Sequence, residues 1–143
     1  MYKHILVPTD GSELSRSAVR HGVTLAKENG AKITFLNVMM PFHVVAAESD
    51  ILTDTRAAYE RQARLRAERL LAECSEAARK AGVASEGRFT FNERPYEDIV
   101  KAAEDADLVV MASHARKGMK GLLLGSQTDR TITHGQTPVL VVR

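Results

Sequence analysis

The sequence predicts an α/β fold: a doubly wound, five-stranded parallel sheet with helices on both faces. Short apolar runs of strand length alternate along the chain with stretches whose apolar residues recur at helical spacing. Such alternation is typical of strand–helix–strand units, in which consecutive strands run parallel. A length of 143 residues is ordinary for one domain, and without a visible linker or internal repeat we expect a single domain over 1–143.

The first half of the chain contains two expected strands, each followed by a loop or helix. Residues 4–8 are a short apolar run that stops at a turn signal, as a buried parallel strand does. Helical spacing follows until Asn29-Gly30 ends it, and residues 32–39 return to a strand pattern. Mixed polarity from about 41 to 54 predicts a long loop, either mobile or functional. A long amphipathic helix then spans 55–81.

The second half repeats the alternation. Residues 83–91 predict a third strand, although their apolar alternation is weak. Pro95 suits the first turn of a helix that runs to about 105. Residues 107–111 form the fourth apolar run, Gly125-Ser126 opens a short helix, and residues 138–142 form the fifth strand.

Charge and hydropathy exclude several classes of protein. The formal net charge of +2 is too small to indicate a nucleic-acid-binding or acidic-membrane-binding protein. Apolar runs fall short of membrane-spanning length, and with no leader-like N-terminus we expect a cytoplasmic protein. The arginines of 56–69 are interleaved with Glu60 and Glu68, so we interpret this run first as the solvated face of a helix; a binding patch is the alternative.

Cys74 is the single cysteine, so the chain forms no internal disulfide and no thiolate metal cluster. It lies at helical spacing with apolar residues of the long helix, which predicts a buried small side chain and not a reactive thiol. The residues at this spacing are Tyr59, Ala63, Ala67, Leu70, Ala77 and Ala81.

Doubly wound sheets bind ligands beyond the carboxyl ends of their strands, where the strand order reverses. In the usual five-stranded order this point lies between the first and fourth strands, which selects the loops 9–12 and 112–126. In the first loop, Asp10 ends a buried strand and faces the crevice, Gly11 permits a tight turn and Ser12 can cap the next helix. Asp10 either holds a ligand hydroxyl or divalent ion, or serves only as a turn residue.

The second loop combines small residues, cations and a helix start. Ser126 and Asp129 have the spacing of a capping box, which places the helix N-terminus there. A helix N-terminus preceded by a glycine presents N–H groups and a favourable dipole to an anion, above all a phosphate, although glycine and serine would also begin a helix that binds nothing. Arg116, Lys117 and Lys120 either neutralise a polyphosphate or face solvent.

His114, in the same loop, is either a phosphate contact or proton shuttle, or a residue whose hydrogen bond shapes the loop. The second interpretation is the more frequent one in proteins. No second ligating side chain stands at suitable spacing in the sequence, so we do not expect His114 to bind a metal.

Four segments together resemble the universal stress protein family, in the family's order and over the whole chain. They are Val7-Pro8-Thr9-Asp10-Gly11-Ser12, Val109-Val110-Met111-Ala112-Ser113-His114, Leu123-Leu124-Gly125-Ser126 and Thr137-Pro138-Val139-Leu140-Val141-Val142. The resemblance implies a Rossmann-like fold of the adenine nucleotide alpha hydrolase type, a homodimer and, in one branch of the family, an ATP site.

That branch carries a motif of glycine, two residues, glycine, nine residues, then glycine and serine or threonine. Gly125-Ser126 match its end, whereas Ala112 and Ala115 occupy the positions of its first two glycines. An added methyl group could crowd a triphosphate or forbid a positive φ, but alanine is the smallest replacement and leaves the N–H intact.

The resemblance also assigns roles to residues. Asp10 would lie near the ribose, the phosphates and a Mg²⁺ ion, and Val38 would meet adenine through its backbone. Ala112 and Ala115 would pass along the ribose and phosphates. The remaining candidates, for the phosphates or the walls of the site, are Pro8, Thr9, Met111, His114, Gly125, Ser126, Gln127 and Thr128.

These residues predict an ATP-binding, stress-responsive regulatory protein and not an enzyme, with at most slow ATP hydrolysis. Asp10 is the one carboxylate expected near the γ-phosphate, and it is better suited to hold the ion than to act as a base. A phospho-receiver domain would need an acidic pair after the first strand and an aspartate after the third, which the sequence lacks. The remaining alternative is a dimeric interaction scaffold that binds no nucleotide, as the two alanines suggest.

The dimer has its own basis in the sequence. Residues 138–142 are a short apolar strand that we expect at a sheet edge. An unprotected edge of this kind invites pairing with a second copy of the chain, so a twofold dimer through this strand is predicted.

Overall fold

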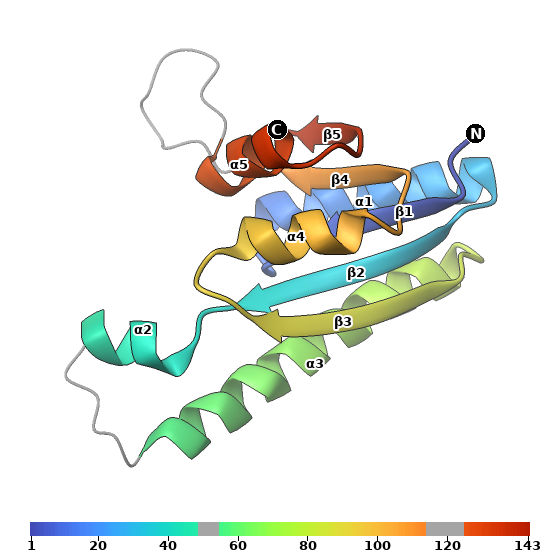
Figure 1. Ribbon diagram of the computed structural model, residues 1–143. Helices are drawn as coiled ribbons and strands as arrows, with labels where there is room; N and C mark the ends of the chain where they lie inside the picture. The colour runs from blue at the N-terminus through green and yellow to red at the C-terminus, as the bar shows by residue number, and fades with distance from the viewer. Residues whose placement is uncertain (49–54, 114–124) are drawn as a thin grey trace.

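The computed structural model describes residues 1–48, 55–113 and 125–143, and these form a sheet of five parallel strands in the order β3-β2-β1-β4-β5 (Figure 1). The predicted doubly wound α/β fold is confirmed. The strands are β1 (His4–Pro8), β2 (Lys32–Met39), β3 (Ser85–Phe91), β4 (Leu108–Ala112) and β5 (Val139–Val142). The helices are α1 (Glu13–Asn29), α2 (Phe42–Glu48), α3 (Arg56–Lys80), α4 (Pro95–Ala103) and α5 (Ser126–His134).

Helices cover both faces of the sheet. Side chains along a strand alternate between faces, so Ile5 and Val7 of β1 enter the core under α1 and α3, whereas Leu6 enters a second core under α4. In this second core Leu6 packs with Ile99 of α4 and Met111 of β4. Helix α5 packs against α4, which places both helices on the same side of the molecule (Figure 1).

Helix α1 lies unusually close to β1, and a glycine makes this possible. A Cβ atom added at Gly22 would lie 2.7 Å from Cγ2 of Val7. Only glycine fits at this position without a shift of the helix or the strand. The approach fixes where α1 begins relative to the end of β1, which is where the candidate site lies.

The expected loop at 41–54 is wrong in its first part, because Phe42–Glu48 form helix α2. The side chain of Phe42 is buried, and its ring lies against that of Tyr59 of α3, with centroids 5.7 Å apart. The guanidinium group of Arg56 also lies over the ring of Phe42, with its central carbon 5.3 Å from the ring centroid. This tertiary anchor holds a short helix that local periodicity did not indicate. The rest of the predicted loop, 49–54, lies outside the described residues.

Helix α3 buries Cys74, as predicted, but along a slightly different stripe. The stripe continues through Leu71 and Ala78, while Leu70 is half-buried and Ala77 is exposed. Cys74 itself is 4% exposed. Burial, with the neighbouring Glu73 charge, raises the pKa of the Cys74 thiol to about 11, so the side chain stays a neutral thiol at physiological pH.

Candidate functional site

The strand order reverses between β1 and β4, and a cavity of about 220 Å³ lies beyond the carboxyl ends of these strands. Every described residue that the sequence assigned to the site lines this cavity. These are Pro8, Thr9, Asp10, Val38, Met111, Ala112, Gly125, Ser126, Gln127 and Thr128. The other two candidates, His114 and Ala115, lie outside the described residues, as do Arg116, Lys117 and Lys120.

Four lining residues were not predicted: Ser15, Leu36, Pro95 and Ile99. Leu36 and Ile99 belong to the core on the α4 side of the sheet, and they form part of the apolar wall of the cavity. Pro95 begins α4 and Ser15 lies in the first turn of α1. Position next to a loop at the carboxyl edge of the sheet could have indicated Ser15 and Pro95, but not Leu36, which lies within β2, or Ile99, which lies further along α4.

The loop after β1 is fixed through the backbone of Thr9. The Thr9 N–H donates to the carbonyl of Leu36 at 2.9 Å, and the Thr9 carbonyl accepts from the buried side-chain amide of Asn37 at 2.8 Å. Both bonds cross to β2, so the chain leaves β1 in one defined direction.

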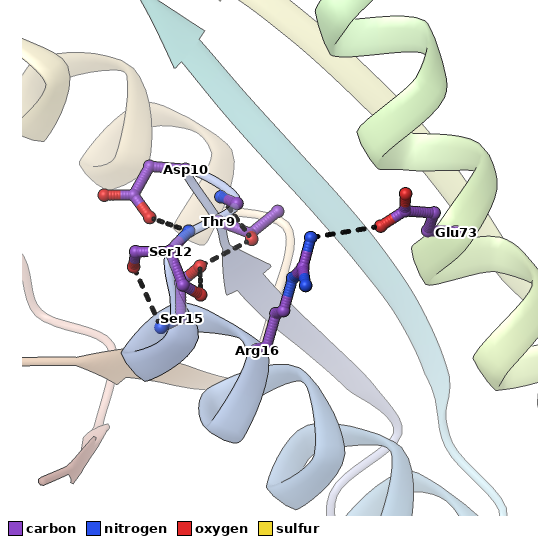
Figure 2. A network of polar contacts seen from close by, with 7 residues as sticks. Thr9, Asp10, Ser12, Ser15, Arg16 and Glu73 are labelled. Atoms are coloured by element: carbon purple, nitrogen blue, oxygen red, sulfur yellow. Dashed lines mark hydrogen bonds and ion pairs between the residues drawn. The ribbon is translucent and has the colours of Figure 1, made fainter.

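Hydroxyl groups then close the start of α1 (Figure 2). Ser12 is the N-cap, and its Oγ accepts from the N–H of Ser15 at 3.2 Å. The Ser15 hydroxyl donates to the Ser12 carbonyl at 3.0 Å, so at its 3.0 Å contact with Thr9 the Thr9 hydroxyl is the donor. Gly11 makes the turn with φ +83°, a backbone conformation that side chains with a Cβ rarely adopt.

Asp10 serves the turn and also faces the cavity. One carboxylate oxygen, Oδ1, accepts from the N–H of Ser12 at 2.9 Å, which is the local turn role that the sequence left open. The residue is exposed and lines the cavity. The two interpretations of Asp10 are therefore compatible, because a carboxylate has several acceptor positions.

The start of α5 differs from the predicted capping box. The N-cap is Gly125 and not Ser126, so Ser126 is the first helical residue and cannot cap Asp129. No side chain in the described part of the chain caps this helix; the N–H of Asp129 donates to the Gly125 carbonyl at 2.9 Å. The N–H groups of Ser126, Gln127 and Thr128 precede this first helical bond, and these three residues line the cavity.

Two hydrogen bonds fix this helix start to β4. The Gly125 N–H donates to the hydroxyl of Ser113 at 3.0 Å, and the buried Thr128 hydroxyl donates to the carbonyl of Ala112 at 3.0 Å. The first turn of α5 is thus held against the strand end.

Ala112 shows what one glycine replacement costs. Ala112 lies in β4, its φ is not positive, and its side chain belongs to the core on the α1 face of the sheet. The backbone at this position has no need of glycine, and the methyl group packs in the core. One of the two alanine departures is therefore compatible with an open cavity.

The side chain of Gln127 has a structural partner. Its Oε1 accepts from the N–H of Tyr96 in the first turn of α4 at 2.9 Å. This bond connects the starts of the two helices on the same side of the sheet. The Oε1 atom of Gln127 is thus occupied, while its backbone N–H and its side-chain NH2 group remain donors for a ligand.

The described residues contain no group of three or more His, Cys, Asp or Glu side chains placed to hold a metal ion. Asp10 is the single carboxylate among the described lining residues. A Mg²⁺ ion here would take most of its oxygen ligands from a phosphorylated ligand and from water, which is how nucleotide-bound Mg²⁺ is commonly held. Within the described ranges, none of the helices is both long and apolar enough to cross a membrane.

Comparisons with known proteins identify the same family over the full length of this chain. The family model described as the universal stress protein family matches residues 1–143. The universal stress protein MJ0531 of Methanocaldococcus jannaschii is 35% identical over 153 residues, covering 100% of this chain and 83% of that protein.

Solved structures show the same similarity. The structure of MJ0577 from the same organism matches with a TM-score of 0.81 at 28% identity, covering 99% of this chain and 96% of that one. A universal stress protein solved in complex with cAMP matches with a TM-score of 0.73 at 25% identity, covering 99% and 97%.

Proposed function

This chain belongs to the universal stress protein family, and from this premise we propose that it is a regulatory protein that binds ATP in the cavity at the carboxyl ends of β1 and β4. The observation that carries the proposal is the composition of the cavity: an apolar wall at one side and, at another, the start of α5, which no described side chain caps. A structural relative in complex with cAMP supports an adenine nucleotide as the class of ligand.

The apolar wall suits the adenine base. Leu36 and Val38 of β2, Met111 of β4 and Ile99 of α4 line it, and flat heterocycles bind to surfaces of this kind. A volume of about 220 Å³ lies below the usual size of a whole-ligand pocket, roughly 300 Å³ and above. We therefore expect the described cavity to enclose the base and sugar, with the phosphates at its mouth.

The start of α5 suits the phosphates. The N–H groups of Ser126, Gln127 and Thr128 stand at the positive end of the helix dipole, and such a site stabilises an anion without any cationic side chain. Asp10 at the opposite side would hold a Mg²⁺ ion jointly with phosphate oxygens, or a ribose hydroxyl.

ATP would act here as a regulatory ligand and not as a substrate. Hydrolysis requires a group that orients or deprotonates the attacking water. Among the described lining residues the one carboxylate is Asp10, which already accepts from Ser12. We expect hydrolysis to be slow or undetectable in the purified protein.

Calorimetry of the nucleotide-stripped protein with Mg-ATP tests the proposal. We expect micromolar binding that Asp10→Ala and Gly125→Val each weaken by about 10-fold or more, as the loss of a charged or anion-binding contact does. Glu28→Ala, which removes an exposed carboxylate at the far end of α1, is the matched control and leaves binding unchanged.

Absence of binding at millimolar Mg-ATP would overturn the proposal and favour the second candidate, a dimeric scaffold without nucleotide. One observation supports a dimer in either case. Strand β5 lies at the sheet edge, and Leu140 on it is 39% exposed. We propose that two copies associate through β5.

Sedimentation at micromolar concentration tests the dimer. The native chain should have the mass of two copies. Leu140→Lys, which places a charge on the exposed edge, should give one copy, while Ile132→Lys in α5, at a residue of similar exposure, serves as the control. A monomeric native chain would contradict this part of the proposal.

A further inference from the structure

A second cleft, of about 490 Å³, lies beside the first, between α3 and the carboxyl end of β2. The two share Asp10 and Val38 as a common wall. The rest of the second cleft is formed by α3, by the last residues of β2 with Met40, by Gly11 and by Arg16 of α1, and no residue of α5 lines it.

The floor of this cleft is apolar and is created by small side chains. Ala63 and Ala67 of α3 are fully buried beneath it, and because each side chain is a single methyl group, the helix leaves space above them. Leu70 and Met39 border the floor. Tyr59 closes one end, where its hydroxyl donates to the carbonyl of Met40.

The cleft carries more cations than anions, because three arginines line it together with two carboxylates, those of Asp10 and Glu73. Arg16, Arg66 and Arg69 line it. Arg16 is opposite Glu73 of α3, with a 3.6 Å ion pair between them (Figure 2). Arg66 and Arg69 form no ion pair or side-chain hydrogen bond with any residue that the structure describes, so two guanidinium charges at the rim are not compensated there.

This arrangement divides the arginine run of α3 into two groups. Arg66 and Arg69 line the cleft, whereas Arg61 does not and Arg64 lines a separate hollow beside Phe42. All of these arginines are exposed, as the interpretation of the run as a solvated helix face predicts, and Arg66 and Arg69 in addition border the cleft.

We propose that the second cleft is a binding site for a small organic phosphate. Its apolar body would lie on the alanine floor and its phosphate would pair with Arg66 and Arg69. A phosphate monoester carries a charge of about −1.5 to −2 at pH 7, which matches the two uncompensated cations better than a carboxylate does. Guanidinium groups also match phosphate oxygens geometrically, with two N–H donors on one plane.

Phenyl phosphate is a suitable probe, and backbone-amide NMR of the full chain is the measurement. We expect shift changes in the segments 37–40 and 63–70, with phenol and inorganic phosphate each binding more weakly than phenyl phosphate. Weaker binding of both fragments would show that floor and rim act together. Equal binding by inorganic phosphate alone would remove the apolar half of the proposal.

Two double variants with the same change of charge on the same helix separate a site from general attraction. Arg66→Gln with Arg69→Gln should weaken phenyl phosphate binding by about 10-fold or more, the loss of charge-assisted hydrogen bonds. Arg61→Gln with Arg64→Gln should change it by no more than about 2-fold, because exposed charges are screened. Equal losses in both variants would overturn the proposal.

The result is distinguishable from that of the ATP proposal. Gly125→Val alters the start of α5 and leaves the second cleft intact, so it should lose Mg-ATP while retaining phenyl phosphate. Shift changes confined to the residues around Ala112 and Gly125 would mean that phenyl phosphate occupies the first cavity, and the second site would then be rejected.

Discussion

Helices α1 and α5 both begin at the carboxyl edge of the sheet, after neighbouring strands, yet their first turns are built in opposite ways. The start of α1 is closed by its own side chains: Ser12 caps it, and Thr9 and Ser15 complete the hydrogen bonds. The start of α5 has glycine at the N-cap and no side-chain cap among the described residues. A side chain thus satisfies one N–H of the first turn of α1, whereas no described side chain does so in α5, and free N–H groups at a helix start suit an anion.

Closing the start of α5 should have the largest effect on binding. Gly125→Asp would place a carboxylate on the open N–H groups and repel a phosphate, so we expect Mg-ATP affinity to fall by about 100-fold or more. The same change should stabilise the fold by a few tenths of a kcal/mol, since aspartate is a better N-cap than glycine. Calorimetry and urea unfolding measure the two effects separately.

Gly125→Asn provides the matched control, because asparagine caps a helix without adding charge. It should cost less affinity than the aspartate. Undiminished ATP binding by the aspartate variant would mean that the phosphates do not lie at α5.

A substitution that strains the turn at Gly11, before α1, should lower the stability of the fold but leave Mg-ATP affinity unchanged. Gly11 has φ +83°, and a Cβ there would meet Leu70 at an ordinary 3.6 Å, so the cost of Gly11→Ala is backbone strain. We expect a loss of about 1–3 kcal/mol in urea unfolding. Gly11→Asn should lose less, because asparagine tolerates positive φ better than alanine. Similar losses for both variants would indicate a cause other than φ.

Removing the cap at the closed start should have a smaller effect. Ser12→Ala deletes the acceptor of the Ser15 N–H, and such losses cost about 1 kcal/mol. Urea unfolding should show this decrease, and Ser12→Asn should restore most of it. If Ser12→Ala instead abolished ATP binding without destabilising the fold, the contrast between the two helix starts would fail.

The ion pair between Arg16 of α1 and Glu73 of α3 should contribute least to the stability of the fold. Arg16 and Glu73 are 51% and 64% exposed, so solvent and salt screen their pair. Arg16→Gln should change the free energy of unfolding by less than about 0.5 kcal/mol. A double-mutant cycle with Glu73→Gln, at low and high salt, measures the coupling. A coupling above this value at high salt would show that the pair is more than a surface contact.

Much of the fold could be predicted because apolar runs mark buried parallel strands directly. The runs at 4–8 and 32–39 coincide with β1 and β2. Helix α2 was missed because Phe42 is anchored by Tyr59, a contact between separate segments. The stripe of α3 was misassigned because adjacent alanines, such as Ala77 and Ala78, suit the same pattern, and only packing on the sheet decides between them.

The candidate site was predictable for a different reason. Parallel strands end at one edge, so the residues that follow β1 and β4 had to meet there. Ser15 and Ile99 were not predicted as site residues because they lie within helices, where the spacing of apolar residues predicts a buried helix face and says nothing about a cavity. The capping box was wrong because spacing alone does not say which residue is the N-cap. In the structure the N-cap is Gly125, whose N–H donates to the Ser113 hydroxyl at the end of β4.

The hydrogen bond between Gln127 and Tyr96 couples the stability of α5 to that of α4. Arg94 at the N-cap of α4 makes no side-chain capping bond, and the N–H of Tyr96 in the first turn donates instead to the Gln127 side chain of α5. If the first turn of α5 frays, the Tyr96 N–H at the start of α4 loses its acceptor on Gln127. A ligand that steadies α5 should therefore slow amide hydrogen exchange in α4 as well, and the two helices should open and close as one cooperative unit.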